Sequence, residues 1–263
     1  MSIEPSISGW LRPDIPFTGA YAVMTTRAGG TSATPFDSMN LGAATGDEAD
    51  AVRRNRRVLA EAIGASPVFL KQVHGARVAR LSTADAAPDA PVHEADASVT
   101  TEPGIACTVL VADCLPVLLA APDGHAVAAA HAGWRGLAGG VVEAALKLLC
   151  EAASCEPAAV QAWLGACIGP RRFEVGADVL QAFGVDPAAP DARRFVPAPA
   201  VAGSPKWLAN LPRLARDQLH RAGVNKIDGG HWCTVEDAAR FYSFRRDRTT
   251  GRMAACIWKR ATK

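Results

Sequence analysis

Residues 105–136 read IACTVLVADCLPVLLAAPDGHAVAAAHAGWRG, and this stretch decides the fold class. Two apolar, β-branched runs, Ile105–Ala112 and Val117–Ala121, are separated by a short polar break, and a third run of small residues follows. Apolar runs of this length bounded by Gly, Pro and Asp are typical of buried strands. We therefore expect consecutive strands in the centre of a sheet, with a helix after the glycines.

Outward from this stretch, predicted strands outnumber predicted helices. Because strands often follow one another directly, the pattern favours an α+β class with a mixed sheet over a regular βαβ series. The predicted strands cover residues 15–26, 67–73, 76–81, 105–112, 117–121, 125–131 and 160–164. The predicted helices cover residues 47–63, 137–151, 175–183 and 208–222. Residues 241–244 and 253–258 are predicted to form a hairpin through the basic turn 245–252.

The chain of 263 residues has no internal repeat and no low-complexity linker, so we expect one domain over residues 1–263. The Pro- and Ala-rich stretch Gly184–Pro205 is interpreted as a surface excursion of that domain. Asp47 and Gly64 are the expected N-cap and end of the first helix, and the arginines within 53–57 are interpreted as its solvated face.

Composition excludes several classes of protein. With 49% hydrophobic and 21% charged residues the chain is not disordered, and 28 basic against 26 acidic side chains argue against nucleic-acid binding through bulk charge. The longest apolar stretch, 104–122, is interrupted by Asp113 and Pro116, which argues against a membrane span. Residues 1–14 do not resemble a secretory signal, and seven cysteines lack disulfide-framework spacing, so we expect a cytoplasmic protein with reduced thiols.

Three polar side chains stand where a predicted strand gives way to Gly or Pro: His74 in KQVHG, Cys114 in ADCLP and His131 in AAAHAGWRG. One thiolate and two imidazoles form a reasonable zinc shell that leaves a fourth position open, as catalytic zinc requires. The same residues also suit a Cys114 nucleophile with His131 as its general base, and spacing does not separate the two interpretations. Asp113 is expected to orient a ligand histidine, to handle a proton, or to cap the strand.

The segment after His131 has features of an anion site. Gly133 and Gly136 let the backbone approach a ligand, Arg135 offers a fork of donors, and a helix beginning near Leu137 would direct free N–H groups at phosphate. Arg27 in TTRAGG is a second candidate of the same kind. The alternative is a tight strand-to-helix turn with Arg135 on the surface.

Eight segments, in order across most of the chain, carry a family resemblance: TTRAGGTSATPFDSMNLG, NRRVL, LKQVHGARV, EADASVT, VLVADCLPVLL, AAAHAGWRG, IGPRRFEVG and FYSFRRDRTTGRMAACIW. The chain resembles the YfiH-like family, the bacterial polyphenol oxidase or purine nucleoside phosphorylase family, also called peptidoglycan editing factor. The trio of QVHG, DCLP and HAGWRG is the most specific part of this resemblance.

The resemblance implies a single α+β domain with a central mixed β-sandwich flanked by helices, similar to the catalytic domain of cytotoxic necrotizing factor toxins. It implies that His74, Cys114 and His131 hold a metal ion, usually zinc, with copper possible in vitro. The implied activities are phosphorolysis of adenosine, inosine and methylthioadenosine, adenosine deamination, and copper-dependent phenol oxidation. The chain departs from the family at Ala43 and Ala44, where an acidic-His pair is common, and at residues 171–172, where a Cys is common.

We therefore expect a monomeric, zinc-dependent purine nucleoside phosphorylase with deaminase side activity and phosphate as co-substrate. Arg27 and Arg135 are the expected phosphate contacts. The alternatives are a cysteine hydrolase or amidase acting on peptidoglycan precursors, a copper-dependent polyphenol oxidase, and a non-enzymatic, zinc-stabilised factor that edits the cell wall. No nucleic-acid or membrane partner is expected.

Overall fold

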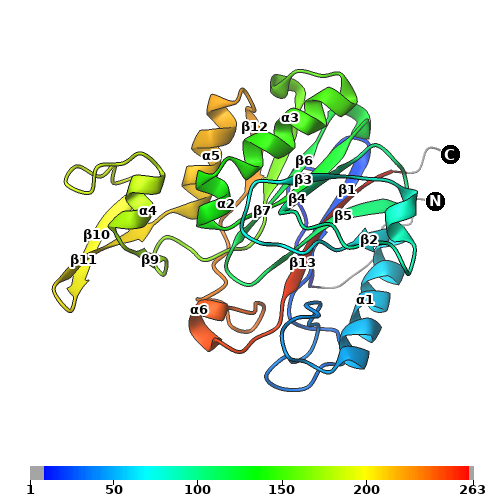
Figure 1. Ribbon diagram of the computed structural model, residues 1–263, viewed down its shortest axis with the longest axis horizontal. Coiled ribbons are helices and arrows are strands. Elements are labelled where there is room, and N and C mark those ends of the chain that lie inside the picture. The colour runs from blue at the N-terminus through cyan, green and yellow to red at the C-terminus, as the bar shows by residue number, and fades with distance from the viewer. Residues whose placement is uncertain (1–8, 261–263) are drawn as a thin grey trace.

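A six-stranded mixed sheet forms the centre of the computed structural model, which describes residues 9–260 (Figure 1). Its order is β12-β8-β6-β7-β4-β3, with parallel pairing between β12 and β8 and between β3 and β4, and antiparallel pairing elsewhere. The strand bounds are β3 Val78–Leu81, β4 Ala97–Thr100, β6 Leu115–Ala120, β7 Val127–Ala132, β8 Gln161–Leu164 and β12 Lys226–Gly229. The central pair, β6 and β7, comes from the stretch that decides the fold class.

A four-stranded sheet of order β1-β13-β5-β2 packs face to face with the first. Its strands are β1 Ala20–Met24, β2 Ser66–Val68, β5 Ile105–Val111 and β13 Met253–Lys259. Val109 of β5 and Ile257 of β13 share one buried apolar cluster with Leu118 and Val127 of the other sheet. The two sheets therefore form a sandwich with a continuous interior.

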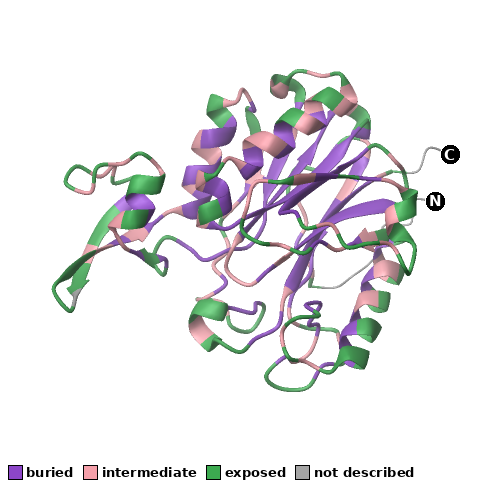
Figure 2. Cartoon of the chain, in the orientation of Figure 1, coloured by how far each residue is buried: buried purple, intermediate pink, exposed green. Residues whose placement is uncertain are grey.

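Helices cover both outer faces of this sandwich, as the expected α+β class requires (Figures 1 and 2). Side chains alternate along β6, so that Leu118 faces the sheet interior while Val117 and Leu119 pack under the helices. The helices α3 Val141–Ala153 and α5 Leu211–Arg221 cover the six-stranded sheet, and α1 Ala49–Ile63 covers the four-stranded one. The small side chains of Ala128 and Ala130 on β7 allow α3 to pack closely against the sheet.

The stretch predicted as a surface excursion carries regular structure. The hairpin of β10 Phe195–Val201 and β11 Ser204–Ala209 pairs with β9 Glu174–Val175 and projects beside α4 Ala177–Ala182 at the left of Figure 1. The predicted helix 208–222 is shorter by three residues at its start, because Leu208 belongs to β11 and Asn210 caps the helix by accepting from the backbone N–H of Arg213.

The predicted C-terminal hairpin is wrong. Residues 253–259 form β13, which lies between β1 and β5, and Phe244–Asp247 forms the short helix α6. The side chain of Ser243 accepts from the N–H of Arg246 and so starts a helical turn where strand was expected. The alternation of apolar and polar residues within β13 does not show that β13 pairs with β1 and β5, which are far away in the sequence.

Two predicted helices differ in detail from those observed. The first helix ends at Gly64, whose φ of 62° confirms the predicted stop, but the N-cap is Glu48 rather than Asp47. The predicted helix 137–151 is split into α2 Trp134–Ala138 and α3, because Gly140 adopts a φ of 86° between them.

Three expectations about the rest of the chain have different outcomes. Within residues 9–260 no helix is long and apolar enough to cross a membrane. The absence of a secretory signal concerns a segment whose residues 1–8 lie outside the described residues. The similarity to the cytotoxic necrotizing factor catalytic domain stays a prediction.

Candidate metal centre and its cavity

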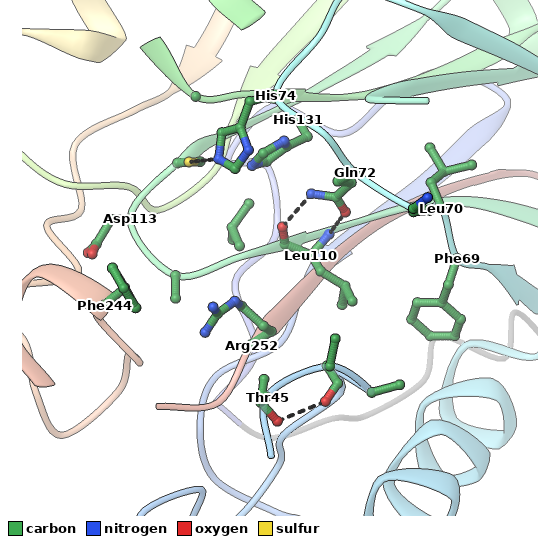
Figure 3. A pocket seen from close by; sticks show the side chains of 18 of the residues that line it. Thr45, Phe69, Leu70, Gln72, His74, Leu110, Asp113, His131, Phe244 and Arg252 are labelled. Atoms are coloured by element: carbon green, nitrogen blue, oxygen red, sulfur yellow. Dashed lines mark hydrogen bonds between the residues drawn. The ribbon is translucent and has the colours of Figure 1, made fainter. Parts of the chain in front are cut away.

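The three polar side chains singled out from the sequence converge at one end of the sandwich. The ligand atoms of His74, Cys114 and His131 all lie within 4.8 Å of one another, although the residues span 57 positions of sequence (131 − 74). Cys114 Sγ lies 3.8 Å from His74 Nε2, and the two imidazole rings meet edge to face with centroids 4.8 Å apart (Figure 3). Among the described residues this is the one group of three or more His, Cys, Asp or Glu arranged to hold a metal ion.

Strand alternation explains why two of these side chains meet. Cys114 immediately precedes β6 and His131 lies near the end of β7, where it pairs with Pro116. Both positions have the same parity as Leu118 and Val127, which face the interior between the sheets. Cys114 and His131 therefore point from adjacent strands into the open end of the sandwich.

A buried carboxylate that sequence reasoning missed, Asp96, holds this arrangement together. Its Oδ1 accepts from His131 Nδ1 at 2.9 Å and from the backbone N–H of His74 at 2.8 Å. Its Oδ2 accepts from the N–H groups of Val73 at 3.1 Å and Gly75 at 2.7 Å. Asp96 thus fixes both the ring of one candidate ligand and the backbone turn that presents another.

This contact also sets the tautomer of His131. With its Nδ1–H donated to Asp96, the imidazole presents an unprotonated Nε2 to the centre, as a metal ligand must. Asp96 is fully buried, which opposes its ionisation, but the hydrogen bonds from His131 and from the N–H groups of Gly75 and Val73 outweigh burial and lower its pKa. Its signal in the sequence is a lone acid directly before the apolar strand ASVT in EADASVT.

Asp113 has a different set of contacts from the orienting role considered for it. Its carboxylate accepts from Thr234 Oγ1 at 2.6 Å and from the backbone N–H of Arg245 at 2.7 Å, and its φ is 104°. The residue that orients a candidate ligand histidine is therefore Asp96. Asp113 connects the β5–β6 turn to the start of α6, and its side chain still lines the cavity described below (Figure 3).

The glycines of HAGWRG are required by packing within the protein. A Cβ on Gly133 would lie 2.9 Å from His74 Cδ2 and 3.0 Å from Cys114 Sγ, so this backbone touches two of the three candidate ligands. A Cβ on Gly136 would lie 2.9 Å from the carbonyl oxygen of Gly75. The segment 133–136 therefore presses directly on the turn that presents His74.

Without a metal ion, Cys114 and His131 form a thiolate–imidazolium pair. Burial disfavours the Cys114 thiolate, but the charge of His131 and hydrogen bonds from both imidazoles outweigh it and lower the pKa of Cys114 to about 6. Burial likewise disfavours the His131 cation, while Cys114 and Asp96 outweigh it and raise the pKa of His131 to about 9. A thiolate is the form of cysteine that both binds metal and acts as a nucleophile.

The donor set fits zinc. One sulfur and two nitrogens are borderline-soft donors, and two such ligands on a tetrahedral zinc ion are about 3.5 Å apart, close to the observed separation of Cys114 and His74. The Asp96 contact supplies the outer hydrogen bond that metal-bound histidines commonly make. Three ligands leave one coordination position for a reactant.

The trio forms one wall of a cavity of about 730 Å³, a size that accommodates a nucleoside together with a small anion. Its aromatic lining is provided by Phe69, Trp134, Phe173 and Phe244. Asp113 is the one carboxylate among the residues that line it, whereas four cations do so: Arg56, Lys71, Arg245 and Arg252. This imbalance favours an anionic ligand.

None of the three guanidinium groups in the lining forms an ion pair with a carboxylate within residues 9–260, and Arg245 donates to the backbone carbonyl of Glu174. Arg56 donates to the carbonyl of Leu41 and lies over the ring of Phe69, and Arg252 donates to the carbonyls of Thr250 and Gly251. Burial lowers the pKa of both, although neither loses its charge near neutral pH. In Figure 3 Arg252 lies across the cavity from the histidine pair.

The arginines chosen from the sequence lie elsewhere. Arg27 contacts Asp37 through an ion pair and a backbone hydrogen bond, and it is absent from the residues that line the cavity. Arg135 is exposed and is not among the residues that line the cavity; it stacks on the ring of Trp134. Arg56 belongs to the arginines interpreted as the solvated face of the first helix. Its contacts with Leu41 and Phe69 lie outside that helix, so the helical pattern does not indicate them.

One departure from the family pattern also lies at the cavity. Ala43 and Ala44 line it, so the positions where an acidic-His pair is common add no charge or ligand here. Arg171 and Arg172, in contrast, pair with Glu236 at the surface.

The protein is a mixed α+β sandwich with a candidate His-Cys-His metal centre at one end. A family model described as multi-copper polyphenol oxidoreductase laccase matches residues 21–260. With the relatives below, this match shows that the chain belongs to the YfiH-like family.

Relatives similar in sequence carry a second description. A Pseudomonas aeruginosa protein named purine nucleoside phosphorylase is 46% identical over 253 residues, covering 96% of this chain and 99% of the relative. The Escherichia coli protein named purine nucleoside phosphorylase YfiH is 46% identical over 245 residues, covering 91% and 94%. Among solved structures, a Neisseria meningitidis protein of family DUF152 is 42% identical with a TM-score of 0.86, covering 97% of this chain and all of that one.

Proposed function

We propose that this protein cleaves purine nucleosides by phosphorolysis. The observation that carries the proposal is the convergence of His74, Cys114 and His131 on the wall of a cavity that also holds three guanidinium groups without a carboxylate ion pair. The names of the relatives support the same reaction class. We propose zinc as the metal, adenosine, inosine and methylthioadenosine as substrates, and a cytoplasmic location, which seven unpaired cysteines support.

Zinc bound by the trio would act as a Lewis acid toward a reactant oxygen in the open coordination position. The chain's own contribution at this wall is geometric. Asp96 holds the His131 ring and the His74 turn in place, and Gly133 leaves room for both imidazole and thiolate.

Arg252 and Arg56 bind the phosphate in this proposal. An oxygen of phosphate attacks the anomeric carbon of the ribose, the glycosidic bond breaks, and ribose 1-phosphate and the free purine result. Because the sugar passes through an oxocarbenium-like state, placing the anion beside it supplies both positioning and charge stabilisation.

The aromatic lining holds the base. The aromatic residues of the lining provide apolar surface against which a purine packs in this proposal, and that surface excludes water that would otherwise compete with phosphate. In this proposal the dihydrogen phosphate ion supplies the proton that the leaving purine takes up, and Asp113, which lines the cavity, relays it. We propose adenosine deamination as a side activity of the same cavity.

The test is incubation of purified, metal-assayed protein with each nucleoside, with and without phosphate. Chromatography should show free base and ribose 1-phosphate only when phosphate is present, and adenosine should yield some inosine. Cys114→Ala should abolish these products. If no purine nucleoside is converted under any of these conditions, the proposal is wrong.

A second function is favoured by the thiolate–imidazolium pair of the metal-free centre. With Cys114 as nucleophile and His131 as general base, the protein would be a cysteine hydrolase or amidase acting on peptidoglycan precursors. Such an enzyme is active without metal and loses activity when iodoacetamide alkylates Cys114. Activity restored by zinc and lost to chelation supports the phosphorylase instead.

A further inference from the structure

Two cysteines far from the cavity are brought together by the way α3 ends. Ser154 adopts a left-handed conformation with φ 51°, and the N–H groups of both Ser154 and Cys155 donate to the carbonyl of Cys150. This is the Schellman arrangement, in which the residue four positions before the left-handed residue and the residue directly after it commonly contact each other. Cys150 and Cys155 occupy these two positions.

The two side chains also share one local environment. Both cysteines pack against the same apolar cluster and line a second hollow of about 560 Å³, and both are partly accessible. Burial, followed by the neighbouring Cys155 sulfur, raises the pKa of Cys150 to about 12. The two sulfurs are therefore near enough to influence each other, at a place that solvent reaches.

We propose that Cys150 and Cys155 form a reversible disulfide, a thiol modification site separate from the metal centre. The oxidant is a low-molecular-mass disulfide such as glutathione disulfide. The Cys155 thiolate attacks one of its sulfurs, the oxidant's S–S bond breaks, and one glutathione thiolate leaves. Cys150 then loses its proton and attacks the Cys155 sulfur, which expels the second glutathione.

In this exchange the protein dithiol loses two electrons and the oxidant is reduced to two thiols, so reduced glutathione reverses it. The roles of Cys150 and Cys155 can be exchanged without changing this balance. The remaining free cysteines are less suited. Cys107 and Cys256 are fully buried, and Cys167 is fully buried beside Cys233, whose sulfur accepts from the N–H of Gly169.

The test uses the full, zinc-loaded chain, incubated with glutathione disulfide and then denatured and labelled with N-ethylmaleimide. The oxidised protein should carry two labels fewer than the reduced protein and no bound glutathione. The tryptic fragment 148–171 should contain the bridge, with Cys167 still labelled. Unchanged labelling, or a bridge between Cys167 and Cys233, would overturn the proposal.

Variants give a second readout. Cys150→Ser should stop at a mixed disulfide on Cys155, while its nucleoside phosphorolysis is unchanged because the site lies outside the catalytic cavity. Ser154→Gly keeps the left-handed cap and should oxidise at the rate of the unaltered protein. Ser154→Pro excludes that conformation and should slow bridge formation at least tenfold. Equal rates for the two Ser154 variants would contradict the role assigned to the helix end.

Discussion

Replacing Asp96 by asparagine removes one of the two oxygens on which the metal centre depends. Each carboxylate oxygen accepts two hydrogen bonds: Oδ1 from His131 and His74, and Oδ2 from Val73 and Gly75. An amide retains a single oxygen, so in either orientation its NH₂ group faces two donors. If the oxygen faces His131, the turn 73–75 loses two hydrogen bonds. If the NH₂ group faces His131, the imidazole must carry its proton on Nε2 and no longer binds metal.

Both orientations weaken metal binding, because one displaces His74 and the other disables His131. Substitutions of the groups that hold metal ligands typically reduce affinity about 10- to 100-fold, which corresponds to about 1.4 to 2.7 kcal/mol. The loss of two hydrogen bonds to a charged group removes about 3 to 6 kcal/mol of folding free energy. Since domains are stable by about 5 to 15 kcal/mol, we expect Asp96→Asn to fold with a clearly lower Tm.

The measurement is a zinc competition titration against a chromophoric chelator, on protein shown to be folded by circular dichroism. Asp85→Asn is the matched control, because Asp85 also accepts from a histidine, His93 Nε2 at 2.6 Å, away from the centre. Zinc affinity of folded Asp96→Asn within twofold of the unaltered protein would refute the reasoning.

Three further outcomes are expected. Gly133→Ala places a methyl group against His74 and Cys114 and should lower zinc affinity about tenfold or more in the same titration; unchanged affinity would show that the turn yields freely. Arg252→Ala should raise KM for phosphate about 10- to 100-fold in initial-rate assays, whereas Arg135→Ala should leave KM unchanged. The reverse result would place the phosphate site at the segment after His131 instead. In metal-free protein, iodoacetamide should alkylate Cys114 with a rate that rises through about pH 6, because the adjacent imidazolium lowers the pKa; a rise only above pH 8 contradicts that pairing.

The structure brings together the three residues that the sequence singled out where a polar side chain interrupts an apolar strand. His74, Cys114 and His131 each stand at such an interruption, and the structure brings their ligand atoms within 4.8 Å of one another. Asp96 follows the same rule at the start of β4 but was passed over, because its partners are backbone N–H groups 21 to 23 residues away, which no local pattern indicates.

Local motifs did not indicate which arginines line the cavity. Arg135 sits among glycines, as anion-binding arginines often do, yet α2 directs it to the surface, where it stacks on Trp134. Arg252, directly before β13, and Arg56, on α1, lie in segments without glycine-rich signatures, yet both line the cavity. A side chain's direction depends on which sheet its strand joins, and that is a long-range property.

By itself, the amino-acid sequence determined the mixed α+β class, the central strands β6 and β7, the stop of α1 at Gly64 and the three candidate metal ligands. These follow from side-chain period, backbone conformation at glycine, and donor chemistry, all of which act over a few residues. Only the tertiary structure decided that β13 inserts between β1 and β5, that Asp96 organises the metal centre, and that Arg252 faces it. Those features arise from packing two sheets across one interior, where contacts join residues far apart in the chain and the free energy depends on all of them together.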